Sequence, residues 1–331
     1  MDQLPFIGYI RPAAIITVLM LITFLNSLDI QKIKKPQMIL FGLFILLSAL
    51  FVPFAQHRGF AYGTTFSMAL YFIFSVSVLL HVNTMKRLKI FISLWIVLAT
   101  YIALRGLAHG SSGGIGGSSF LYDENDFSLF LDMMLPFSVY MFMYETKKLK
   151  KIFYLISSML LLAGVVVSFS RGGFVGLLAA LFVILMFSKK KLMALVIIGV
   201  FAAFVYLIGE TFSVHGVNYL SEMSTVTDTQ ESTASMRIDT WTSAWHMFLD
   251  NPVGVGPGNF PVRYPEYQLP SMKRNMWGFV AHSLWFTLIP ELGIIGITIY
   301  ALWLYYNMKD VFWLRSLKDQ ADPSLRFFFH M

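Results

Sequence analysis

Two arginines and one histidine have the side chains best suited to chemistry in this 331-residue sequence. Arg171 lies in the segment FSRGG, Arg237 in ASMRID and His282 in AHS. A guanidinium is a rigid fork of donors that matches phosphate oxygens. An imidazole exchanges a proton near neutral pH and can accept one from a hydroxyl group. These residue types together indicate an anionic phosphate substrate and a proton transfer, although Arg171 alone is better explained as an anchor to lipid headgroups.

A second group of polar residues accompanies these three. Asp123, Asn125 and Asp126 come just before an apolar stretch, and Asp132 follows Asn125 by seven residues, on nearly the same helical face. Glu291 lies inside another apolar stretch. A carboxylate at membrane depth is costly, so Asp132 and Glu291 either contact substrate or pair with a buried arginine. The acidic run favours a helix start over a divalent-cation site, and we expect no metal and no cofactor.

The composition indicates what positions these residues. Hydrophobic residues make up 57% of the chain and charged residues only 13%, about half the usual charged fraction of a soluble domain. The chain contains no cysteine, which excludes disulfides and thiolate metal sites. The sequence therefore predicts an all-α membrane protein, a polytopic bundle of transmembrane helices.

Nine stretches are long and apolar enough to cross a bilayer as helices. They lie near residues 10–28, 37–55, 62–82, 88–105, 127–144, 152–169, 173–187, 192–209 and 283–306.

The connections between these stretches alternate in charge. Most of the 25 Lys and Arg residues fall within 32–35, 86–89, 147–151, 189–191 and 309–326. By the positive-inside rule these segments are cytoplasmic, which explains the net charge of +7 without a nucleic-acid partner. Arg171, Arg237 and His282 then all lie on the outer, periplasmic side.

The expected organisation has four parts. They are transmembrane helices 1–8 in residues 1–209, a periplasmic loop in 210–282, helix 9 in 283–306, and a cytoplasmic tail or the start of a further helix in 307–331. This arrangement places the N-terminus outside and ends in a short apolar run, so we expect that one or both ends are truncated or that a further helix is missing.

The periplasmic loop contains a predicted amphipathic helix that begins near Ser232 and ends at Asn251-Pro252. Its apolar stripe consists of Ile238, Trp241, Trp245, Phe248 and Leu249. A plain packing face is the favoured interpretation of this stripe, and the lipid–water interface is the alternative.

The outer location restricts the chemistry. No nucleotide pool exists there, so a transferase must use a substrate that is already activated, and a lipid diphosphate-linked sugar is the natural candidate. Two arginines would neutralise the diphosphate leaving group, and a histidine would accept the proton of the acceptor hydroxyl.

Four segments in order resemble the O-antigen ligase and O-antigen polymerase superfamily of bacterial envelope glycosyltransferases. They are residues 116–137, 166–179, 233–260 and 281–296. The resemblance implies a multi-pass inner-membrane enzyme with a large periplasmic loop. Such an enzyme transfers a glycan from undecaprenyl diphosphate to an acceptor hydroxyl, inverting the anomeric carbon without a metal. Family members usually have more spans, so nine is expected to be a minimum.

The resemblance also implies residue roles. Arg171 and Arg237 would bind the diphosphate, and His282 would be catalytic beside a lipid A core or similar acceptor. Ser283 stands where the family often has Asn. A polymerase or a protein O-oligosaccharyltransferase of the same superfamily remains open. A membrane transporter is the alternative of another class, in which Asp132 and Glu291 would line a pathway.

Overall fold

The computed structural model describes residues 29–109, 123–188, 190–211 and 232–316, together with short pieces at 213–214, 217–218 and 223–224 and positions 20, 22, 23 and 25. The helices are α3 (Ile30–Ile33), α4 (Pro36–Phe51), α5 (Arg58–His81), α6 (Met85–His109), α7 (Glu124–Tyr144), α8 (Lys148–Val167), α9 (Arg171–Phe187), α10 (Lys191–Thr211), α12 (Ser232–Asp250), α13 (Phe260–Tyr267) and α14 (Leu284–Ser316). Two short strands, β1 (Ser213–Val214) and β2 (Val217–Asn218), pair antiparallel.

The chain is a polytopic α-helical membrane protein, as the composition predicts. Helices α5, α6, α7, α8 and α14 are long and apolar enough to cross a membrane, and α4, α9 and α10 contain shorter apolar segments. These helices coincide with the expected spans from 37–55 onward. The first expected span, 10–28, lies largely outside the described residues.

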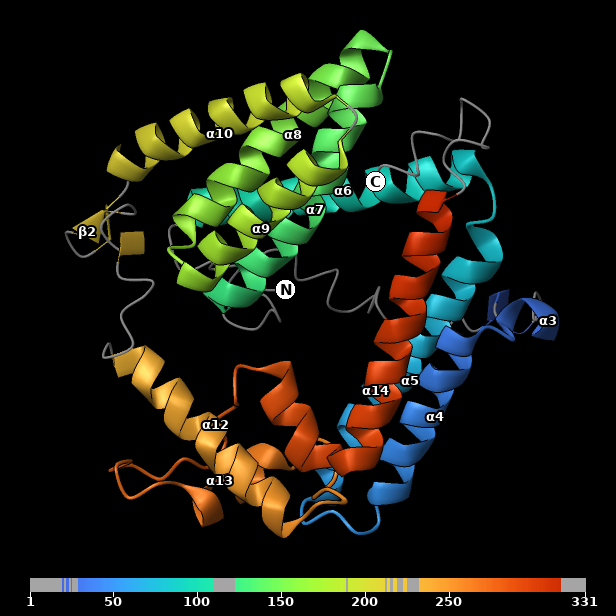
Figure 1. Cartoon of the computed structure of the whole chain (residues 1–331), viewed down its shortest axis with the longest axis vertical. Coiled ribbons are helices and arrows are strands. Elements are labelled where there is room, and N and C mark those ends of the chain that lie inside the picture. Colours follow the sequence, from blue (N-terminus) through green and yellow to red (C-terminus); the bar gives the residue numbers. More distant parts are fainter. Residues whose placement is uncertain are drawn as a thin grey trace, which may run out of the picture. The chain divides into compact units, whose positions relative to one another are not determined.

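The described chain divides into two compact units. The first contains residues 84–227 and the end of α14, and the second contains the chain before residue 84 together with 228–313. In the first unit, α7, α8 and α9 lie side by side, and α10 contacts α8 and α9 (Figure 1). Its core is built from apolar side chains of α6 to α10, among them Phe127, Leu131, Leu135, Leu161, Leu162, Val165, Leu177 and Phe201.

Hydroxyl groups join the helices of the first unit. Ser138 on α7 donates to the Tyr154 carbonyl of α8 at 3.0 Å, and Ser158 donates to the Ser138 hydroxyl at 3.0 Å. The Tyr154 hydroxyl lies 2.8 Å from that of Ser93 on α6. Interhelical hydrogen bonds of this kind stabilise association in lipid, where the hydrophobic effect between helices is weak.

The second unit combines membrane helices with α12 and α13, which lie in the segment predicted to be a periplasmic loop. Gln37 at the start of α4 donates to Tyr306 O and to the Asp310 carboxylate near the end of α14, so these two helices run antiparallel. A separate apolar core joins α12, α13 and the segment before α14. It consists of Ala244, Met247, Val255, Phe260, Tyr264, Met276 and Ala281, with Trp241 and Phe286 packed against it.

Helix α14 is not the continuous span that the sequence predicts for 283–306. Its backbone leaves the helical region at Gly293, where φ is +61° and ψ is −160°. Three backbone hydrogen bonds connect the break to the loop after α12: Val255 N to Pro290 O, Gly256 N to Glu291 O, and Ile294 N to Pro252 O. The loop thus supplies partners for groups that the broken helix leaves unpaired.

Helix α12 coincides with the predicted amphipathic helix, but the predicted packing face is wrong. Ile238, Trp245 and Leu249 are exposed, whereas Thr240, Ser243, Ala244 and Met247 are buried. The buried face is lined by small residues because α13 approaches closely there: the Tyr264 hydroxyl donates to Thr240 Oγ1 at 2.6 Å. Ile238, Trp245 and Leu249 therefore remain at the surface, whereas Trp241 packs against the core.

Candidate functional site

Arg171 is the first residue of α9 and follows a tight turn, residues 168–170, after α8. We call residues 168–173 the Arg171 turn. Phe169 has a positive φ of 53°, an uncommon conformation for a residue other than glycine. Ser168 Oγ accepts from Ser170 N at 3.1 Å, and Ser170 Oγ accepts from Gly173 N at 2.9 Å, so side-chain caps fix the turn.

The turn is also bonded to α7. Ser170 Oγ donates to Asn125 Oδ1 at 2.8 Å. Asp123 caps α7, since its carboxylate accepts from Asn125 N at 2.8 Å and from Asp126 N at 3.3 Å. This confirms that the acidic run starts a helix. Asn125 thereby connects the start of α7 to the start of α9, where Arg171 lies.

Further along α9, Gly173 and Gly176 allow this helix to pack closely against α7. A Cβ atom at Gly173 would lie 2.5 Å from the Ser128 hydroxyl oxygen, and one at Gly176 would lie 2.6 Å from an oxygen of Asp132. Asp132 is 5% exposed, and within the described part of the chain neither of its carboxylate oxygens has a hydrogen-bond partner. The arginine partner expected for Asp132 is therefore not found among those residues.

His282 lies in the second unit, two residues before α14. We call residues 281–284 the His282 segment. His282 is exposed and has a positive φ of 46°. Phe169 and His282 are the two non-glycine residues with positive φ among those that the structure describes. Strained backbone of this kind costs about 1–3 kcal/mol per residue and tends to occur at functional sites.

Aromatic contacts fix the His282 segment on both sides. The indole nitrogen of Trp241 on α12 donates to the Ala281 carbonyl at 2.9 Å. The Trp241 ring also stacks on Phe286 of α14, with centroids 5.1 Å apart and planes 7° apart. Ser283 O accepts from Thr287 N at 3.0 Å, so the residue after His282 caps the helix.

Arg237 lies one turn before Trp241 on α12. Residues four apart on a helix are neighbours on its surface. Arg237 is half-buried and lies next to the residue that bonds Ala281, directly before His282. The structure therefore associates Arg237 with the His282 segment through Trp241.

Glu291 is buried, and its carboxylate holds the loop after α12. Oε2 accepts from Gly258 N at 2.8 Å, and Oε1 accepts from Phe260 N at 3.1 Å. Its structural partners are thus backbone amides rather than the arginine that the sequence suggested. Gly258 has a φ of +70°, and a Cβ there would lie 2.6 Å from Thr64 Oγ1, so glycine is needed at this position.

The predicted site residues thus form two groups. Arg171 lies with the α7 residues in the first unit, where Asn125 bonds the turn and Asp132 lies deeper. Arg237 and His282 both belong to the second unit, where Trp241 bonds Ala281 and Glu291 holds the loop after α12. A shared cavity for Arg171, Arg237 and His282 stays a prediction.

Sequence reasoning missed Trp241 as a positioning residue. Its place on the predicted apolar stripe gave no indication that its indole N–H reaches Ala281, 40 residues later. A buried or half-buried Trp requires a partner for its N–H, which was the available signal.

Comparisons with known proteins agree with these observations. Residues 156–301 match the family model described as O-Antigen ligase. The chain is 24% identical over 288 residues to the "Teichuronic acid biosynthesis protein TuaE" of Bacillus subtilis (strain 168). That alignment covers 80% of this chain and 58% of the relative, so the chain spans little more than half of the relative's length. No solved structure matches significantly. The two matches confirm the predicted resemblance to the O-antigen ligase and polymerase superfamily.

Proposed function

We propose that this protein is a membrane glycosyltransferase that moves a glycan from undecaprenyl diphosphate to an acceptor hydroxyl on the periplasmic side of the bacterial inner membrane. The observation that carries this proposal is the Trp241–Ala281 hydrogen bond. It joins α12, which carries Arg237 one helical turn before Trp241, to the residue directly before His282, an exposed histidine with positive φ.

The chemistry requires three events. The acceptor oxygen forms a bond to the anomeric carbon, the bond from that carbon to the diphosphate oxygen breaks, and the acceptor proton goes to His282. Negative charge develops on the departing diphosphate, and Arg237 and Arg171 stabilise that charge with charge-assisted hydrogen bonds. Attack opposite the leaving group inverts the anomeric carbon, and the arginines supply the charge neutralisation that a metal ion would otherwise provide.

The acceptor distinguishes two versions of this reaction. The family description, O-Antigen ligase, supports transfer to a lipid A core or similar acceptor. The relative's printed name, a teichuronic acid biosynthesis protein, supports a polysaccharide as the product and therefore a polymerase that extends a glycan chain. Both versions use the same donor and the same three residues.

Purified protein in lipid nanodiscs tests the proposal. Undecaprenyl diphosphate carrying a short glycan is offered with either a lipid A core oligosaccharide or a second glycan as acceptor, and products are resolved by mass spectrometry. We expect a new glycosidic product and released undecaprenyl diphosphate. Absence of transfer to either acceptor, from protein shown to be folded, would contradict the proposal.

A further inference from the structure

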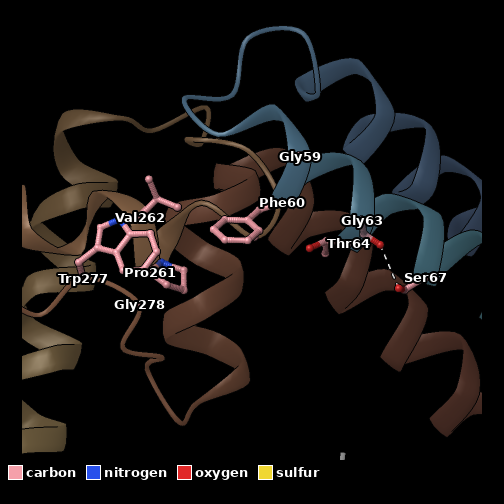
Figure 2. Close-up of a pocket in the computed structure, with 10 residues that line it drawn as sticks. Gly59, Phe60, Gly63, Thr64, Ser67, Pro261, Val262, Trp277 and Gly278 are labelled. Carbon is pink, nitrogen blue, oxygen red and sulfur yellow. Dashed lines mark hydrogen bonds between the residues drawn. The ribbon is translucent and has the colours of Figure 1, made fainter. Parts of the chain in front are cut away.

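A pocket of about 590 Å³ lies beside α5 in the second unit. Figure 2 shows its two sides: Gly59, Gly63 and Ser67 follow one another along α5, and Pro261 and Trp277 lie opposite. The glycines make room, because a Cβ atom at Gly63 would have no atom within 4 Å. The pocket is thus an open space beside a membrane helix.

The lining of this pocket suits a hydrocarbon chain rather than a charged group. None of the described residues that line it is charged, and its walls include Phe60, Val262 and Trp277. The Ser67 hydroxyl donates to Gly63 O at 2.9 Å, so its proton already takes part in a hydrogen bond within α5. A hydrocarbon chain placed against these apolar walls would be removed from water, which is favourable.

The location of the pocket matches the end of a lipid chain next to its headgroup. Helix α5 is a candidate membrane span, and the pocket follows it from Gly59 in the first turn to Ser67, about 12 Å further along the axis. The charge pattern predicts that this is the outer end of the helix. Trp277 is 56% exposed, which is typical of an aromatic residue at the membrane interface.

One end of the pocket is formed by a residue that lies close to His282 in the sequence. Gly278 lines it, and His282 follows four residues later, so their Cα atoms are at most about 14 Å apart. Between them, Phe279 packs on the same core as Trp241, whose indole nitrogen bonds Ala281. A diphosphate held by Arg237 near His282 would have its attached chain within reach of the pocket.

We infer that this pocket binds the isoprenoid chain of the lipid diphosphate donor at the units nearest the diphosphate. The inference rests on the proposed function and names the part of the substrate that the second unit recognises. Binding here would align the leaving group with His282, because the chain and the diphosphate are covalently joined.

Filling the pocket tests the inference. Gly63→Leu adds a side chain to the open space, and Gly42→Leu on α4 is the matched control, since a Cβ atom at Gly42 also has no atom within 4 Å. The probe is a polyprenyl diphosphate with a photoreactive diazirine on its first isoprene units, and labelled peptides are identified by mass spectrometry. It carries no glycan, so labelling does not depend on transfer.

We expect the label on residues 59–67 or 261–278 in the wild type and in Gly42→Leu, and a loss of about tenfold in Gly63→Leu, comparable to excluding two methylene groups. Excess undecaprenyl diphosphate should compete, and phosphatidylglycerol should not. Unchanged labelling in Gly63→Leu, or equal competition by phosphatidylglycerol, would overturn the inference.

Kinetics separate this inference from the proposed function. Gly63→Leu should raise KM for an undecaprenyl donor by about tenfold, leave kcat nearly unchanged, and have no effect on a donor whose diphosphate carries a methyl group in place of the isoprene chain. Equal effects on both donors would argue against the chain-binding role. If the wild type transfers no glycan but the labelling pattern holds, the proposed function fails and the pocket assignment remains.

Discussion

The Arg171 turn and the His282 segment resemble each other in form but are stabilised in different ways. Each precedes a helix, and each contains a non-glycine residue with positive φ, Phe169 or His282. The Arg171 turn is held by short-range hydrogen bonds that Ser168 and Ser170 accept, and also by the bond from Ser170 to Asn125 on α7; both serines are 2% exposed. The His282 segment is held by Trp241, from a helix 40 residues earlier.

This difference indicates how each residue responds to change. The Arg171 turn has local caps in addition to its one hydrogen bond to α7. His282 depends on the contact of Trp241 on α12 with Ala281 and with Phe286 on α14. Its orientation should therefore change when the apolar core of α12, α13 and the segment before α14 is disturbed. Substitutions at the two places should therefore separate direct chemical roles from positioning roles.

The largest effect is expected for His282→Ala. Loss of a general base typically lowers the rate by about 10²- to 10⁴-fold, and glycan transfer should fall by this amount. His282 is exposed, so the thermal unfolding temperature should stay near that of the wild type. His246→Ala, an exposed histidine on α12, is the control. Equal transfer by wild type and His282→Ala would remove the histidine from the mechanism.

Replacing either arginine by lysine should have the next largest effect. Lysine keeps the charge but lacks the two-pronged donor geometry, and a hydrogen bond to a charged group contributes about 1.5–3 kcal/mol. We expect kcat/KM to fall about 10- to 100-fold in Arg171→Lys and in Arg237→Lys. Arg263→Lys, at a half-buried arginine on α13 that pairs with Glu266, is the control. Full activity in Arg171→Lys alone would reduce that residue to a lipid anchor and confine the site to the second unit.

Glu291→Gln should mainly lower stability. The carboxylate accepts hydrogen bonds from two backbone amides, and the amide group of Gln would present a donor to one of them. We expect unfolding to become easier by about 1–3 kcal/mol, measured by thermal denaturation in detergent. Glu266→Gln, at a partly exposed site, should change little. A stability equal to the wild type would mean that the loop after α12 is held by its backbone bonds alone.

Ser170→Ala should have the smallest effect of the four. It removes the cap of α9 and the hydrogen bond to Asn125, at a cost of about 1 kcal/mol. The unfolding temperature should drop slightly, and transfer should decrease only if the turn also orients Arg171. Ser283→Ala provides the comparison at the other helix start. A larger activity loss in Ser283→Ala than in Ser170→Ala would support the dependence of His282 on its surroundings.

The helices could be predicted from the sequence because each depends on local information. Apolar runs of membrane length define α5 to α8, and Asp123 and Ser170 mark two helix starts as capping residues. The break at Gly293 could not be predicted, because it depends on hydrogen bonds to a loop about 40 residues earlier.

The candidate residues could be predicted, but not their surroundings. Arg171, Arg237 and His282 follow from residue type and side of the membrane. The packing face of α12 could not be inferred from hydrophobicity, since in a membrane protein the most apolar residues also face lipid. The pocket beside α5 joins residues about 200 positions apart, and no pattern in one sequence reveals such a pair.

The anchoring of the loop after α12 also constrains the order in which the protein assembles. Asn259 accepts a hydrogen bond from His57 N, 202 residues earlier, while Glu291 approaches the same loop from 31 residues later. During synthesis the loop can meet α5 early, but it lacks its carboxylate partner until α14 has entered the bilayer. The surroundings of His282 are therefore complete only when the final described helix is in place.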